Sequence, residues 1–262
     1  MQEETVRNLT RRYNREAEAY RELWAPVLLV SGRRLLGELK NTAVNRALDI
    51  GAGVGVLLPE IQAAFPDATV GGCDLSEGMM SMAPASFNRS VMNATGLGIA
   101  TGSIDLVTMV FMLFHVREPI DGLKEARRTL KDGGRIGIVT WAEQRDSDAE
   151  VVWNECLDAF GAPPSDTLNQ SNHHLVDTTD KMHTLLTGAG FTDVRSWTEE
   201  LECADNLDHF IRIKTNMGHT KGRYDALNPD TQKAVVTEAR KRLDTPDFAS
   251  VSGIVFTVAS TG

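Results

Sequence analysis

Three glycines at alternate positions, Gly51, Gly53 and Gly55, interrupt the stretch ALDIGAGVGVLLPEI between an apolar run and a segment with helical spacing. A glycine-rich turn between a strand and a helix lets a ligand contact backbone N–H groups at the start of the helix, where side chains would otherwise block it. Asp74 ends the next predicted strand, and its carboxylate could accept hydrogen bonds from both hydroxyls of a ribose. Together these residues predict a site for a cofactor that carries a nucleoside.

The spacing of the glycines separates two such cofactors. The dinucleotide fingerprint G-x-G-x-x-G requires a glycine at position 56, where this chain has Val56, so the pattern here is G-x-G-x-G. Asp49, two residues before the first glycine, also places a negative charge where a pyrophosphate is disfavoured and an ammonium or a sulfonium is tolerated. The pattern therefore favours S-adenosylmethionine (SAM), and an NAD(P)-dependent oxidoreductase stays as the alternative.

Alternating strands and helices must position these residues. Apolar runs and β-branched residues predict strands in RALDIG, ATVGGCD, SVMNA, SIDLVTMVF and GRIGIVTW. Helical spacing predicts a helix from about Val56, a short helix in EGMMSMA that Ser76 caps, and a helix from Ile120 that ends at KDGG. Strands and helices in alternation imply a parallel sheet with right-handed crossovers, which binds ligands at the carboxyl ends of its strands.

The second half of the chain departs from this alternation. EVVWNECLDAF and TDKMHTLLTGAG read as helices, FTDVRSWTEELEC and VSGIVFTVAS read as strands, and residues 205–248 between the two strands look helical and amphipathic. Two late strands separated by such an insertion predict a β-ribbon at the edge of the sheet, with the insertion over the ligand end. The expected fold is α/β, Rossmann-like and doubly wound, with a mostly parallel seven-stranded sheet, an antiparallel C-terminal strand and a helical lid.

Four motifs carry a resemblance to a known family. ALDIGAGVG, CDLSEGMM, SIDLVTMVFMLFHV and LKDGGRIGIVTW occur in this order between about residue 44 and residue 141. They resemble the successive motifs of the class I SAM-dependent methyltransferases, specifically the small-molecule group called methyltransferase type 11, and LLTGAGFTDV resembles that family's next helix and strand. We therefore expect one methyltransferase domain over 1–262: a lid (1–40), a SAM-binding core (41–141), the rest of the sheet (142–204 and 249–262) and a helical insertion over the active site (205–248).

The resemblance implies roles for individual residues. The glycine motif would hold the methionine moiety, Asp74 the ribose, Leu75 one face of the adenine, and Asn93 with Ala94 the adenine edge. Position 93 is usually Asp in the family, but an Asn amide can still accept and donate there. The full set of expected cofactor-binding residues is Asp49, Gly51, Ala52, Gly53, Gly55, Asp74, Leu75, Met79, Asn93, Ala94, Phe111 and Tyr20.

His115 is the expected catalytic residue. It follows the fourth strand, where substrate and transferable methyl meet in the family, and it could act as a general base, orient the substrate, or serve a structural role. His173 and His174 lie in a polar loop, where either a substrate or metal role or simple exposure is open. Substrate walls are expected from residues 1–30, 142–176 and 205–248, which the shared motifs do not cover.

Composition narrows the class of protein. The chain has 262 residues and a formal net charge of -9, which argues against a general nucleic-acid binder. Three widely spaced cysteines fit a reduced compartment, no metal constellation is visible, and the charged N-terminus lacks the apolar core of a signal peptide. We expect a cytoplasmic enzyme without a membrane span that methylates an O, N or C nucleophile of a small molecule and releases S-adenosylhomocysteine (SAH). A non-catalytic SAM-fold protein is the further alternative, and the oligomeric state is open.

Overall fold

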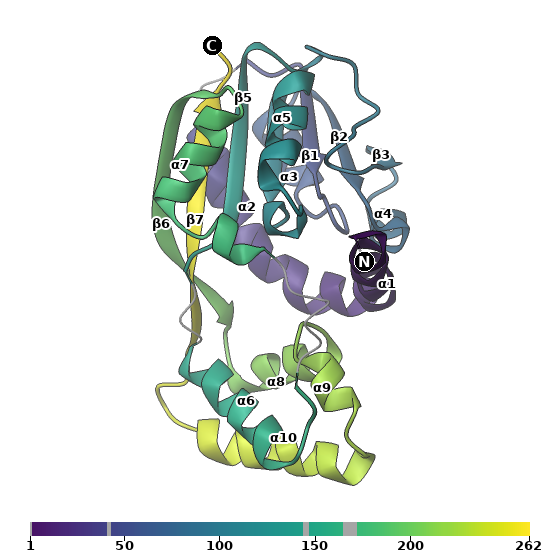
Figure 1. Ribbon diagram of the computed structural model, residues 1–262, viewed down its shortest axis with the longest axis vertical. Helices are drawn as coiled ribbons and strands as arrows, with labels where there is room; N and C mark the ends of the chain where they lie inside the picture. Colours follow the sequence, from purple (N-terminus) through teal and green to yellow (C-terminus); the bar gives the residue numbers. More distant parts are fainter. Residues whose placement is uncertain (1, 41–42, 144–146, 165–171) are drawn as a thin grey trace.

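A seven-stranded sheet forms the centre of the protein (Figure 1). The computed structural model describes residues 2–40, 43–143, 147–164 and 172–262. The strands are β1 (Arg46–Ile50), β2 (Thr69–Asp74), β3 (Asn88–Val91), β4 (Ile104–Val110), β5 (Leu130–Trp141), β6 (Thr192–Ala204) and β7 (Ser250–Ser260). Their order is β3-β2-β1-β4-β5-β7-β6; β1 to β5 pair in parallel, while β7 runs antiparallel to both β5 and β6. The expected fold class and the edge ribbon are confirmed.

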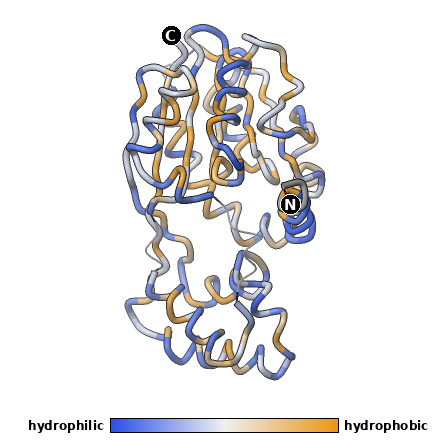
Figure 2. Tube along the Cα trace, viewed as in Figure 1, coloured by the Kyte–Doolittle hydropathy of each residue, from blue (hydrophilic) through white to orange (hydrophobic). Residues whose placement is uncertain are grey.

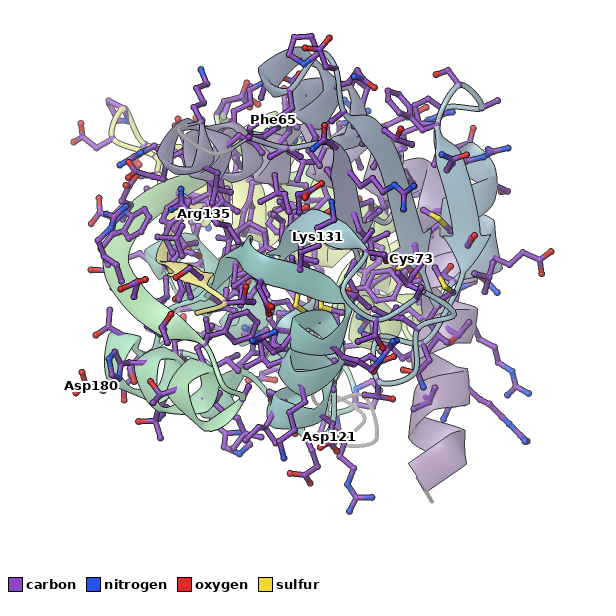
Figure 3. All side chains as sticks on the ribbon, turned by 90° about the horizontal axis from the view of Figure 1, so that it is seen from above. Phe65, Cys73, Asp121, Lys131, Arg135 and Asp180 are labelled. Carbon is purple, nitrogen blue, oxygen red and sulfur yellow. The ribbon has the colours of Figure 1, made fainter. Side chains whose placement is uncertain are left out.

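Helices cover both faces of this sheet. Helices α2 (Ala25–Leu39) and α3 (Leu58–Ala64) lie on one face, and α5 (Pro119–Thr129) and α7 (Thr179–Gly188) lie on the other. Seen from above, Phe65 at the end of α3 and Asp121 of α5 lie on opposite sides (Figure 3). Because both faces are covered, most residues of the central strands β1 and β4 are apolar, and orange is frequent in this part of Figure 2.

The N-terminal segment lies across the carboxyl ends of the strands. Helix α1 (Gln2–Ala19) continues through the π-helical segment Tyr20–Trp24 into α2. It packs against α4 (Glu77–Met82), where Asn14 Oδ1 accepts hydrogen bonds from Ser76 Oγ at 2.6 Å and from the backbone N–H of Gly78 at 2.9 Å. A Cβ at position 78 would lie 2.8 Å from Asn14 Cα, so glycine permits this close packing. Since α2 covers the sheet, only the first part of segment 1–40 has the position of a lid.

A helical layer with its own apolar core lies below the sheet in Figure 1. Trp153, Phe210 and Val235 are almost completely buried in it. It is held to the N-terminal segment by two hydrogen bonds, from His209 Nε2 to the Leu23 carbonyl (3.0 Å) and from the Gly218 N–H to Glu16 Oε2 (3.4 Å). Its helices are α6 (Asp148–Ala159), α8 (Leu207–Asn216), α9 (Lys221–Asp225) and α10 (Pro229–Leu243).

Some element boundaries differ from those expected. The backbone becomes extended at Leu130, so α5 ends at Thr129 and the KDGG residues belong to β5. Strand β3 ends at Val91, because Asn93 folds into a turn in which its Oδ1 accepts from the N–H of Thr95. The helix expected from about Val56 begins at Leu58. Within the described ranges, no helix has the length and hydropathy needed to cross a membrane.

Candidate active site

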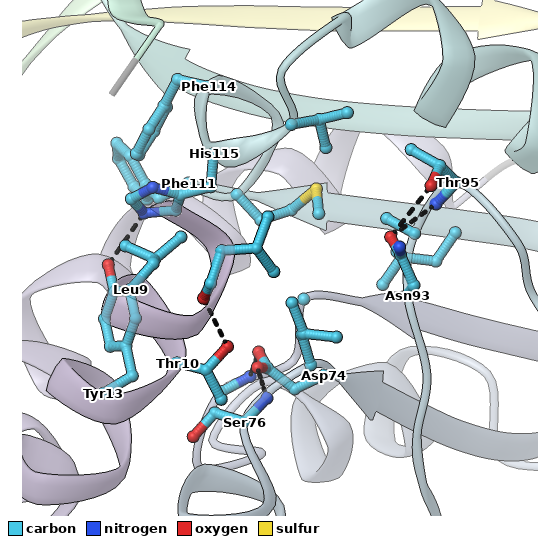
Figure 4. A pocket seen from close by; sticks show the side chains of 18 of the residues that line it. Leu9, Thr10, Tyr13, Asp74, Ser76, Asn93, Thr95, Phe111, Phe114 and His115 are labelled. Atoms are coloured by element: carbon cyan, nitrogen blue, oxygen red, sulfur yellow. Dashed lines mark hydrogen bonds between the residues drawn. The ribbon is translucent and has the colours of Figure 1, made fainter. Parts of the chain in front are cut away.

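A cavity of about 630 Å³ lies at the carboxyl ends of β1, β2 and β4 and is covered by α1. Figure 4 shows Leu9, Thr10 and Tyr13 reaching it from α1, opposite Asp74 at the end of β2. The carboxyl ends of parallel strands are where sheets of this topology bind ligands. The expected site residues that line the cavity are Tyr20, Gly51, Gly53, Asp74, Leu75, Met79, Asn93, Ala94, Phe111 and His115.

The glycine turn has two structural reasons for its composition. Gly51, Gly53 and Gly55 all have positive φ angles, of 74°, 55° and 72°, which side chains disfavour. A Cβ on Gly51 would lie 2.5 Å from Met112 Cβ, and one on Gly55 would lie 2.6 Å from Ala83 Cβ. At Gly53 the nearest atom would be Tyr20 Cε1, at 3.6 Å. Of the three glycines, only Gly53 therefore combines the turn conformation with room for a Cβ on the side of the cavity. Gly55 does not line the cavity.

Asp74 is held by the backbone of both neighbouring loops. Its Oδ2 accepts from the N–H of Gly53 at 3.0 Å, and its Oδ1 accepts from the N–H of Ser76 at 2.8 Å. Burial raises the pKa of Asp74, while these backbone hydrogen bonds act in the opposite direction. The carboxylate thus has a fixed orientation on the cavity wall and retains lone pairs for a ligand.

Asp49 lies deeper than expected. It is 3% exposed, accepts a hydrogen bond from Thr108 Oγ1 at 2.6 Å, and does not line the main cavity. Together with Ala52 it borders a narrow second cavity that Tyr20 and Gly51 separate from the first. Burial raises the pKa of Asp49 to about 7. The side chain is therefore poised to gain or lose a proton near neutral pH when a charge is placed beside it.

At the opposite end of the cavity, Asn93 is already engaged. Its Oδ1 accepts from both the N–H and the Oγ1 of Thr95, each at 3.1 Å (Figure 4). Its amide nitrogen is the group left to donate to a ligand. Leu75 and Ala94 add apolar surface beside it, an arrangement suited to a flat ring with a polar edge.

Phe111 has an unusual backbone conformation at the end of β4. Its φ of 53° is rare for an aromatic residue, and its N–H donates to the Val139 carbonyl at 2.8 Å. The ring lies 4.5 Å from that of Trp141, which in turn lies 6.0 Å from the ring of Trp24. Such strained residues concentrate at functional sites, and here the strain turns the strand end toward the cavity.

His115 lies in the cavity wall under α1. Its Nε2 is 2.8 Å from the hydroxyl of Tyr13 (Figure 4). Burial lowers the pKa of His115 to about 3, and the charges of Arg12 and His173 act in the same direction. The ring is therefore neutral near pH 7, and the tautomer of the ring decides whether Tyr13 or Nε2 donates this hydrogen bond. With so low a pKa, His115 is a weak base.

The structure adds site residues that were not among those expected. Val6, Leu9, Thr10 and Tyr13 line the cavity from one face of α1. They belong to the segment expected to form a lid and a substrate wall, but the individual residues that face the cavity were not identified from the sequence. Phe114 was missed as well: its ring lies 4.5 Å from His115 and stacks at 4.2 Å on His173.

The two loop histidines differ. His173 is brought to the neighbourhood of His115 through Phe114, whereas His174 is exposed and does not line the cavity. In the described part of the chain, no group of three His, Cys, Asp or Glu side chains is arranged to hold a metal ion. Residues 144–146 and 165–171, within the segment expected to form a substrate wall, lie outside the described residues.

Comparisons with known proteins find similar methyltransferases. Residues 48–138 match the family model described as a methyltransferase domain. A malonyl-[acyl-carrier protein] O-methyltransferase of Geobacter sulfurreducens is 26% identical over 222 residues, which cover 81% of this chain and 80% of the relative. A demethylmenaquinone methyltransferase of Beutenbergia cavernae is 27% identical over 164 residues, or 61% of this chain and 62% of the relative.

Solved structures share the fold. A SAM-dependent methyltransferase of Thermotoga maritima superposes with a TM-score of 0.58 at 16% identity, over 95% of this chain and 98% of that one. A phosphoethanolamine N-methyltransferase of Haemonchus contortus, solved with SAH, superposes with a TM-score of 0.55 at 18% identity. The match covers 87% of this chain but only 52% of that protein, about half its length.

Proposed function

We propose a cofactor site and a course of reaction for this chain, which belongs to the class I SAM-dependent methyltransferases. The cofactor would lie in the cavity under α1, and the methyl group would pass to an oxygen, nitrogen or carbon nucleophile of a small molecule. The observation that carries this assignment is the hydrogen bond between the Gly53 N–H and Asp74 Oδ2, at 3.0 Å. This hydrogen bond joins Gly53, the glycine of the turn at which a Cβ would meet no close contact, to Asp74 at the end of β2. Both residues line the same cavity.

The residues present fit SAM. Asp74 presents a fixed carboxylate for the ribose hydroxyls, and Gly53 leaves space where a side chain would obstruct the ligand. The Asn93 amide nitrogen and the apolar surface of Leu75 suit the adenine. Asp49, behind the glycine turn, would favour the positively charged methionine end. When bound, SAM supplies a methyl group activated by a sulfonium.

The contribution of the protein to the reaction would be chiefly positional. An in-line displacement needs the nucleophile held on the axis of the methyl–sulfur bond, and such positioning can supply roughly 7 to 11 kcal/mol. Helix α1 covers one side of the cavity, and Phe111 with His115 forms the wall at the end of β4. Because His115 is a weak base, we assign it the task of holding Tyr13 and the acceptor in place, and an acceptor that enters already deprotonated needs no base.

The acceptor would enter between the end of β4, the segment around His173 and the helical layer below. The relatives are named for chemically different acceptors, malonyl-[acyl-carrier protein] and demethylmenaquinone, so neither is carried over directly. The negative net charge favours a small molecule over a nucleic acid. A cytoplasmic location stays a prediction from the sequence.

The alternatives are less well supported. A nicotinamide cofactor would need a phosphate cradle, and the glycine turn keeps Val56 where the dinucleotide motif has its third glycine. A binding protein without catalysis would not require a cavity that extends past the cofactor position to Phe114 and Asn172.

A metabolite screen tests the proposal. The protein is incubated with SAM and a small-molecule extract, and mass spectrometry detects compounds that gain one methyl group in place of a hydrogen. We expect at least one methylated product together with SAH, formed much more slowly by the Asp74→Ala variant when SAM is limiting. Product formation at the same rate by that variant would place the cofactor elsewhere.

A further inference from the structure

Arg12 carries a positive charge beside the expected transfer site. It precedes Tyr13 on α1, and its guanidinium carbon lies 5.0 Å from the centre of the Tyr13 ring. The charge of Arg12 also opposes the rise that burial causes in the pKa of the Tyr13 hydroxyl. Tyr13 and His115, which share a hydrogen bond, both line the cavity, so Arg12 is one side chain removed from its wall.

This arginine lacks a counter-ion among the described residues. Its Nε is buried and has no hydrogen-bond partner. Glu16, one turn further along α1, pairs with Arg15 at 3.5 Å and accepts from the Gly218 N–H. Elsewhere partly buried arginines do find carboxylates, as Arg223 does in Asp158. An unsatisfied buried donor costs about 1 to 3 kcal/mol, so an arginine in this state needs a reason beyond stability.

A second unsatisfied nitrogen lies on the other side of His115. His173 Nδ1 is also buried without a partner, and its ring stacks on Phe114 at 4.2 Å. Arg12, on α1, lies against the Tyr13 ring that contacts His115, and His173, after residue 171, stacks on Phe114, whose ring lies 4.5 Å from that of His115. Both also lower the pKa of His115. The nearby acid Asp177 is already paired with Lys181 at 2.6 Å.

We propose that Arg12, assisted by His173, binds a carboxylate group of the methyl acceptor. A guanidinium presents donors that match the two oxygens of a carboxylate, which makes arginine the preferred residue for this task. An acceptor carboxylate would offer acceptors to both buried nitrogens and give Arg12 the counter-ion that the described residues do not supply. This inference rests on the proposed function, because it takes the region around Tyr13 and His115 as the acceptor side of the cavity.

Calorimetric titration of the SAH-saturated protein tests this subsite. The probes are acetate, malonate, succinate and benzoate, each compared with its neutral amide. We expect at least one carboxylate to bind while its amide does not, and Arg12→Gln to weaken that binding by roughly tenfold or more. Arg11→Gln removes the same charge from the exposed neighbouring position and should leave the affinity unchanged.

Several results would overturn the subsite. They are failure of all four carboxylates to bind, equal binding by Arg12→Gln and wild type, or an equal loss in Arg11→Gln, which would indicate general surface electrostatics. SAH affinity, measured in the same series, should be the same in wild type and both variants. Loss of SAH binding by the wild type would instead contradict the proposed function itself.

Thermal unfolding gives an independent readout. Without ligand, Arg12→Gln should unfold at the same temperature as wild type or higher, since it removes an unsatisfied donor and an unpaired charge. The binding carboxylate should raise the midpoint of the wild type and not that of Arg12→Gln. Arg12→Lys keeps the positive charge but lacks the paired N–H donors of the guanidinium, so the carboxylate should still raise its unfolding midpoint in part. A carboxylate that shifts Arg12→Gln as much as wild type would contradict the assignment.

Discussion

The hydroxyl of Tyr13 lies 2.8 Å from Nε2 of His115, a contact that joins the N-terminal helix to the segment after β4 across 102 residues of the chain. Because the low pKa of His115 keeps its ring neutral and burial raises the pKa of Tyr13, the contact is a hydrogen bond between two neutral side chains. It fixes α1 over the cavity at the same place where the acceptor must approach. The Tyr13–His115 pair thus links the position of α1 over the cavity to the wall at which we propose methyl transfer occurs.

We expect Tyr13→Phe and His115→Ala to weaken SAH binding non-additively. Each variant removes the same hydrogen bond, so the double variant should lose less than the sum, with a coupling of about 0.5 to 1.5 kcal/mol. His115→Ala should raise KM for the acceptor more than it lowers kcat, since His115 is a weak base. Additive losses of SAH binding free energy would show that the two residues act independently. A kcat lowered roughly 10²-fold with KM unchanged would restore His115 as a general base.

Gly53→Ala and Gly55→Ala form a matched pair. Both place a side chain at a positive φ, but the new Cβ faces the cavity at position 53 and meets Ala83 Cβ at 2.6 Å at position 55. Gly53→Ala should lose about 1 kcal/mol of unfolding free energy and most of the SAH affinity. Gly55→Ala should lose roughly 1 to 3 kcal/mol of stability, from strain and overpacking, and bind SAH nearly normally once folded.

Denaturant unfolding and calorimetric titration measure the two effects separately. The reverse pattern, with Gly53→Ala binding SAH like wild type and Gly55→Ala failing to bind although folded, would exchange the roles that the structure gives to the two glycines.

SAM affinity should depend on pH through Asp49. Burial raises its pKa to about 7, and a positively charged ligand beside it favours the ionised form. Below that pH, binding must first release a proton, so affinity should rise by up to about tenfold per pH unit and level off above pH 7. Asp49→Asn should bind SAM more weakly than wild type at high pH, and its SAM affinity should not change with pH. Titrations from about pH 5.5 to about pH 8.5 test this; an equal slope in wild type and Asp49→Asn would exclude Asp49.

The fold was largely predictable because its signals are local. Alternating apolar strands and helices specify a covered parallel sheet, and the late strands around an amphipathic insertion specify the edge ribbon. The glycine turn and Asp74 were predictable for a similar reason, since the ends of β1 and β2 must meet at the same edge of the sheet.

The remaining site features depend on contacts between distant segments. Nothing near Gly55 in the sequence shows that Ala83 packs against it, so the reason for glycine at position 55 could not be distinguished from the reason at position 53. Tyr13 acquires its partner only when α1 folds across the sheet, and the pKa of His115 follows from the burial that this packing causes. The lack of a hydrogen-bond partner for Arg12 Nε among the described residues is likewise a property of the assembled fold.

Calorimetric titration with SAH, comparing wild type, Asp74→Ala and Asp67→Ala, tests most directly whether the cavity under α1 is the cofactor site. Asp67 is an exposed acid before the start of the same strand that Asp74 ends, and its loss removes equal charge. We expect wild type and Asp67→Ala to bind SAH alike, and Asp74→Ala to bind more weakly by about 1.5 to 3 kcal/mol, because a hydrogen-bonding charged group is lost. SAH binding by Asp74→Ala as tight as that of wild type, or no binding by wild type, would contradict the assignment.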